Sequence, residues 1–168
     1  MKKVLPIIAV LLLAASVKAG TVTWNCYDIS KDGSYIDGGV AYLFVGDSTA
    51  GVAEAIQDGT FNYSSAIATA TTDDEGCLTK SKIGNYTSTS VSLYMVVFDQ
   101  STPSSTANFI VSSVKTQTFG ASGNKSFDFS DSVSSSSATW TPVTIPEPTT
   151  VALLALGLAA LGLKRKVA

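Results

Sequence analysis

The C-terminal stretch of the chain combines two prolines, a short apolar run and a basic cluster. Residues 151–163 carry no charge and no strongly polar side chain. As a helix they would be roughly 20 Å long, whereas the hydrocarbon core of a bilayer is roughly 30 Å thick. The run therefore predicts a short transmembrane helix that a bilayer holds only weakly. It is preceded by Pro146, Glu147 and Pro148 and followed by Lys164, Arg165 and Lys166.

This order of parts resembles the PEP-CTERM sorting signal of exported bacterial proteins, here residues 146–168. The resemblance implies processing by an exosortase, a transpeptidase-like membrane protease, and anchoring in the inner membrane before processing. It also implies association with an exopolysaccharide or biofilm matrix, at the cell surface or outside the cell. The alternatives are a plain tail anchor and a buried C-terminal helix. A core helix is rarely apolar on every face and then followed by three cations, which favours the signal.

Residues 1–19 have the pattern of a signal peptide. Lys2 and Lys3 precede an apolar run, residues 4–15, and small side chains stand at Val17 and Ala19. This pattern predicts cleavage after Ala19. Basic residues flank both apolar runs on their outer ends, which places both ends in the cytoplasm and the middle outside.

The exported middle, residues 20–145, is acidic. It contains five lysines, twelve acids, no arginine and no histidine, which gives a net charge of −7. Without arginine clamps for phosphate, nucleic-acid binding is not expected. Without histidine there is no Ser-His-Asp triad and no His-containing zinc site. Paired carboxylates would formally suffice for glycoside hydrolysis, but the acids fall mostly in expected turns, so we expect no enzyme activity.

The two cysteines of the chain, Cys26 and Cys77, lie in this exported part. An even pair in an oxidising compartment predicts one disulfide. Closing a loop of this length would stabilise the fold by roughly 4 kcal/mol in the chain-entropy model. The alternative, a catalytic cysteine, lacks a histidine to activate it.

The pattern of the exported part predicts a mainly β fold, a small antiparallel β-sandwich over residues 20–130. Val22, Trp24 and Cys26 alternate with polar residues as in a half-buried strand. Residues 40–45 form a continuous apolar run that fits a central strand. Trp24, Tyr42 and Tyr94 are expected in the core. Further strands are expected at residues 60–71, 91–99, 107–119, 126–129 and 138–143.

One short helix is expected in this sandwich, over residues 50–57. Ser48 or Thr49 would cap it and Gly59 would end it. Its apolar residues fit one face, so it should pack across an end of the sandwich. Residues 131–145 are rich in serine and proline and predict an extended linker, with a last strand around Trp140 as the alternative.

Calcium is the one cofactor hypothesis that the sequence raises. Asp28, Ser30 and Asp32, followed by Gly33, match the first positions of an oxygen-lined calcium loop. The twelfth position, which should be a bidentate glutamate, is Gly39, and the alternative is a set of hydrated turn acids. The favoured function is thus a non-catalytic surface or matrix protein. The alternative is an extracellular carbohydrate- or calcium-binding module.

Overall fold

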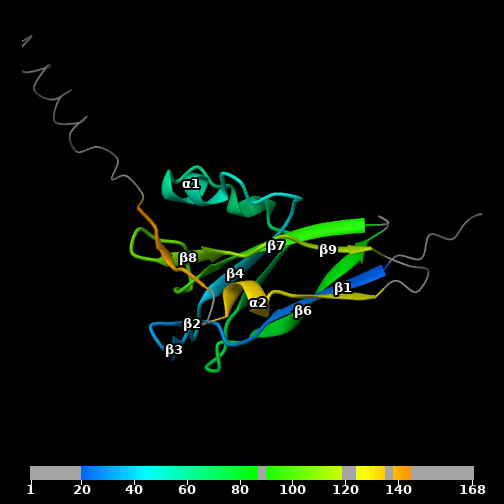
Figure 1. The fold of residues 1–168 in the computed structure, drawn as a ribbon, viewed down its shortest axis with the longest axis horizontal. Coiled ribbons are helices and arrows are strands. Elements are labelled where there is room, and N and C mark those ends of the chain that lie inside the picture. Colours follow the sequence, from blue (N-terminus) through cyan, green and yellow to red (C-terminus); the bar gives the residue numbers. More distant parts are fainter. Residues whose placement is uncertain (1–19, 87–89, 119–123, 135–137, 145–168) are drawn as a thin grey trace, which may run out of the picture.

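The computed structural model describes residues 20–86, 90–118, 124–134 and 138–144 (Figure 1). The predicted signal peptide, the Pro-Glu-Pro triplet, the apolar run 151–163 and the basic cluster lie outside these ranges. None of the helices within them is both long and apolar enough to cross a bilayer. The elements are β1 (Gly20–Cys26), β2 (Ser30–Lys31), β3 (Ser34–Tyr35), β4 (Val40–Val45), α1 (Val52–Gln57), η1 (Tyr63–Ser65), β5 (Ala68–Thr71), β6 (Leu78–Tyr86), β7 (Ser90–Phe98), β8 (Asn108–Val111), β9 (Lys115–Thr118), β10 (Lys125–Asp128), α2 (Ser130–Val133) and β11 (Thr141–Pro142).

The strands form two packed sheets and one small hairpin. The larger sheet has the order β11-β8-β7-β4-β5, with β9 pairing the first half of β7, and the smaller has the order β10-β1-β6. Trp24 and Phe127 of the smaller sheet and Met95 of the larger are fully buried in one core cluster. The structure is therefore mainly β and consistent with a β-sandwich. It differs from the prediction in one pair, because β1 and β10 run parallel, with Val22 opposite Lys125.

The larger sheet buries both of its faces. In β4, Ala41 and Leu43 pack into the core between the sheets, while Val40 and Phe44 belong to a second cluster with Val52 and Ile56 of α1, and with residues of β7 and β8. Figure 1 shows the resulting three layers, with α1 on one side of the larger sheet and β1 and β6 on the other. Burial on two faces explains why β4 is apolar throughout rather than alternating.

Helix α1 forms where the apolar pattern predicts it, but two details differ. It covers the outer face of the larger sheet rather than an end of the sandwich. Its N-cap is Gly51, at φ 76°, with no side-chain cap. The predicted cap residue Ser48 instead accepts a hydrogen bond from Ala50 N at 3.1 Å, before the helix begins. A glycine takes the N-cap position because the backbone enters the helix from the left-handed region.

The C-terminal part of the described chain packs onto the domain. The predicted linker, residues 131–145, contains most of α2, a second short helix, and the whole of β11. Val133 is fully buried and Val143 is 4% exposed. Val143 N donates to Ala107 O at 2.9 Å. The alternative of a last strand near Trp140 is therefore the one that the structure shows.

Candidate ligand-binding site

The site starts from the β2–β3 hairpin. Asp32 and Gly33 form its two-residue turn with φ values of 52° and 82°. Two successive positive φ values identify a type I′ turn, for which Asp-Gly is a preferred sequence. Ser30 pairs with Tyr35 and Lys31 with Ser34. The turn thus places Asp32 at the exposed tip of a short hairpin.

This hairpin holds the residues of the calcium hypothesis. Asp28 and Asp32 are exposed, whereas Ser30 is buried to 6% exposure. Within the ranges that the structure describes, no three His, Cys, Asp or Glu side chains gather as a metal site would require. Calcium at Asp28, Ser30 and Asp32 stays a prediction.

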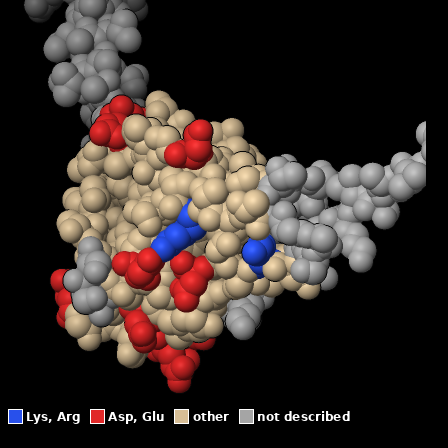
Figure 2. Space-filling model, turned by 45° about the vertical axis from the view of Figure 1, so that its right-hand side comes forward, with Lys and Arg blue, Asp and Glu red and all other residues tan. Residues whose placement is uncertain are grey.

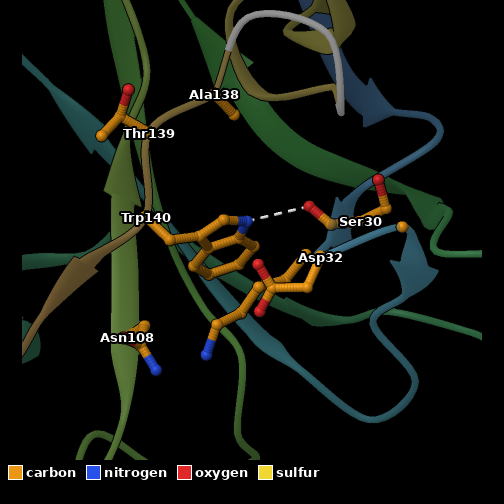
Figure 3. A pocket seen from close by; sticks show the side chains of 8 residues that line it. Ser30, Asp32, Asn108, Ala138, Thr139 and Trp140 are labelled. Carbon is orange, nitrogen blue, oxygen red and sulfur yellow. Dashed lines mark hydrogen bonds between the residues drawn. The ribbon is translucent and has the colours of Figure 1, made fainter.

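Trp140 packs against the base of the hairpin. Its Nε1 donates to the carbonyl oxygen of Ser30 at 2.8 Å. Trp140 and Ala138 pack against the core between the two sheets, and both residues are half-buried. Figure 3 shows the ring between Asn108 and Ser30, with Asp32 beside it. The hydrogen bond and the packing together fix the plane of the indole.

A hollow opens beside this ring, with a volume of about 390 Å³. This volume falls within the roughly 300–1,000 Å³ typical of small-molecule sites. We call it the Trp140 pocket, and it is lined by Ser30, Lys31, Asp32, Gly33, Asn108, Ala138, Thr139 and Trp140. Three separate parts of the chain, the hairpin, the start of β8 and the segment before β11, therefore meet at one place.

A hydrogen-bonded cluster holds the pocket in shape. Lys31 Nζ lies 2.7 Å from Asp99 Oδ2, and the Asp99 side chain is 10% exposed. Asp99 also accepts hydrogen bonds from Asn108 N and Nδ2, both at 2.7 Å. Burial alone would raise the pKa of Asp99, but the Lys31 ammonium and the Asn108 donors outweigh it and hold the pKa below its usual value.

The charge left over in the pocket is negative. Asp99 already neutralises Lys31, whereas Asp32 has no ion-pair partner among the described residues. On the face in Figure 2, acidic side chains occur in several separate groups and exceed the basic ones. This face carries no basic patch that would suit a phosphate backbone.

The cysteines lie close to each other, Cys26 at the end of β1 and Cys77 directly before β6. Cys26 is opposite Leu78, the residue after Cys77. Both are free thiols in the structure, Cys26 buried and Cys77 partly exposed. Burial raises the pKa of the Cys26 thiol to about 12. The disulfide between them stays a prediction.

Sequence reasoning placed Trp140 in a last strand but missed it as a site residue. A signal was available, because Trp140 is the one tryptophan in a stretch otherwise rich in serine, threonine and proline. Asp32-Gly33 also has the sequence of a hairpin turn. Neither signal could show that the two stretches meet, because they are 110 residues apart between Ser30 and Trp140.

Comparison with protein families finds the PEP-CTERM protein-sorting motif at residues 144–166. This match confirms the resemblance at the C-terminus. Comparisons with curated proteins and with solved structures found no match.

Proposed function

From the sorting motif at residues 144–166, we propose that the chain is a non-catalytic surface or extracellular-matrix protein associated with exopolysaccharide. The motif marks an exported protein that an exosortase sorts and that is anchored in the membrane before processing. The match to this motif is the observation that carries the proposal. The net charge of −7 over residues 20–145 supports this proposal, because a net charge far from zero favours solubility.

The position of the last described strand agrees with processing at the motif. The last strand, β11, ends at Pro142, and the backbone hydrogen bond from Val143 to Ala107 follows directly. The motif begins at residue 144. Cleavage near Pro146 to Thr150 would therefore remove the signal and leave each described element in place.

Mass spectrometry of the exported protein tests this proposal. The expected C-terminus lies between Pro146 and Thr150, with residues 151–168 removed. Replacing Pro146 and Pro148 with alanine should retain the protein in the inner membrane. Pro142→Ala is a matched control, because Pro142 is an exposed proline outside the triplet, and it should be processed normally. An intact C-terminus in the outer fraction would contradict exosortase processing.

The Trp140 pocket favours a second candidate, an extracellular ligand-binding module that reaches the same place by the same route. Calcium and carbohydrate are its two candidate ligands. Isothermal calorimetry with calcium tests the first: heat and a higher melting temperature, both lost in Asp28→Asn, are the expected signs of a site. No heat at millimolar calcium removes calcium from the proposal.

A further inference from the structure

We propose that the Trp140 pocket binds a neutral saccharide, with one sugar ring stacked on the indole of Trp140 and sugar hydroxyls hydrogen-bonded to Asp32. This proposal rests on the second candidate above, the ligand-binding module, and is independent of exosortase sorting.

The indole supplies the apolar half of the recognition. A pyranose ring has a face of C–H groups, and burying that face against an aromatic ring removes apolar surface of both from water. Trp140 is half-buried and lines the pocket, while the hydrogen bond from its Nε1 to Ser30 O holds the ring in place. A ring that is already fixed loses little rotamer freedom when a ligand binds.

The polar half comes from groups that still have hydrogen-bonding capacity. An ionised aspartate only accepts hydrogen bonds, so Asp32 suits hydroxyl donors of the ligand. Ser30 and Thr139, whose hydroxyl groups can donate and accept, are also among the residues that line the pocket. A ligand with many hydroxyls and one apolar face matches this set.

The charges argue against other ligand classes. An anion would meet Asp32 and a lysine that Asp99 already neutralises at 2.7 Å. A quaternary ammonium could contact the indole and Asp32, but it has no hydrogen-bond donor for the other polar residues that line the same hollow, such as Thr139 and Asn108. A neutral saccharide leaves fewer of these groups without a partner.

Tryptophan fluorescence gives a direct readout, because the chain has two tryptophans and Trp24 is fully buried. The full chain would be titrated in a polyoxyethylene detergent, which has no sugar headgroup. The probes are neutral pentasaccharides of β-1,4-glucose, β-1,3-glucose, α-1,4-glucose and α-1,6-mannose, with tetramethylammonium and inorganic phosphate as comparison ligands. A saturable blue shift with at least one pentasaccharide, and protection of Trp140 from acrylamide quenching, are expected.

Asp32→Asn is the decisive variant. Asn-Gly is at least as favourable as Asp-Gly in a type I′ turn, so the hairpin should be retained, and circular dichroism checks this. Removing the charge should weaken saccharide binding about tenfold, which corresponds to about 1.4 kcal/mol. Asp37→Asn is the matched control, because Asp37 is exposed and does not line the pocket.

Trp140→Ala should abolish binding in calorimetry, and Trp140→Phe should weaken it, provided that both fold. The proposal is overturned if no pentasaccharide gives a saturable signal, if Asp32→Asn binds as tightly as the unaltered chain, or if only tetramethylammonium or phosphate binds. Sorting is measured separately by the C-terminus of the exported protein, so failure of one proposal leaves the other standing.

Discussion

The two neighbouring cysteine side chains have different surroundings, and this difference predicts their reactivity. Cys26 is fully buried, and burial raises the pKa of its thiol to about 12, whereas Cys77 is partly exposed. In the reduced, folded protein we therefore expect Cys77 to react promptly with Ellman's reagent and Cys26 only after unfolding. Cys77→Ser should remove the fast phase and leave the slow one.

The same measurement tests the disulfide. Protein exported and purified without reductant, then unfolded, should show no reactive thiol if Cys26 and Cys77 are bridged. Two thiols per chain in that sample would rule out the bridge. If the bridge is present, its reduction should lower the free energy of unfolding by roughly 4 kcal/mol.

Asp99 predicts a pH dependence of stability. Its pKa is lowered in the folded state, so it binds fewer protons there than in the unfolded chain. Its contribution to stability is therefore present above the ordinary value of 3.8 and is lost as the pH falls through the lowered folded value. Asp99→Asn should destabilise the protein by about 1 to 3 kcal/mol at neutral pH. It should also make the free energy of unfolding fall less steeply as the pH is lowered.

Urea unfolding between about pH 7 and about pH 3 measures this slope. Asp47→Asn is a suitable control, because Asp47 is exposed and forms no ion pair within the described part of the chain. If the free energy of unfolding of Asp99→Asn falls with decreasing pH as steeply as that of the unaltered chain, the prediction is wrong.

At the scale of elements, one predicted strand is interrupted beside Ser112. The sequence predicts one strand over residues 107–119, but the structure divides it into β8 and β9. Between them, Met95 N of β7 donates to Ser112 Oγ at 2.8 Å, and Ser112 N donates to Met95 O at 2.8 Å. The serine hydroxyl thus takes the place of a backbone carbonyl in the ladder.

Ser112→Ala should therefore destabilise the protein by about 1 to 3 kcal/mol, because it leaves a buried N–H of Met95 without a partner. Ser113→Ala is the neighbouring control, where the side chain is exposed and the change should stay within about 0.5 kcal/mol. Chemical denaturation of both variants compares them. Equal stability of the two variants would show that the hydroxyl of Ser112 is dispensable.

Strands and helices could be predicted from the sequence where their own residues determine them, and not where a distant partner does. The apolar runs of β4 and of residues 93–98 in β7 were predicted because a strand segment that is buried on both faces is apolar at successive positions. β6 was missed because Leu78–Tyr86 contains two lysines and a glycine and neither alternates nor forms an apolar run. The N-cap at Gly51 and the break at Ser112 depend on backbone geometry and on a distant partner, which no periodicity reveals.

At the scale of the whole molecule, the described fold ends just before the sorting motif. A chain that stops after Thr144 should unfold at the same urea concentration as the exosortase-processed protein. A chain that stops after Ser134 loses Trp140, β11 and the buried Val143, and it should be less stable by about 3 to 5 kcal/mol. Equal stability of the two truncated chains would show that residues 138–144 contribute nothing to the fold.

The position of β1 also sets the order in which the molecule can assemble during export. β1 is the central strand of the smaller sheet, yet its partners are β6 and β10, and Asn25 pairs with Asp128. In a chain that crosses the membrane from its N-terminus, β1 emerges first, and its partner β10 emerges nearly last. Pairings over such sequence distances close slowly. The smaller sheet therefore gains its β10 edge, and is complete, only after residue 128 has crossed the membrane.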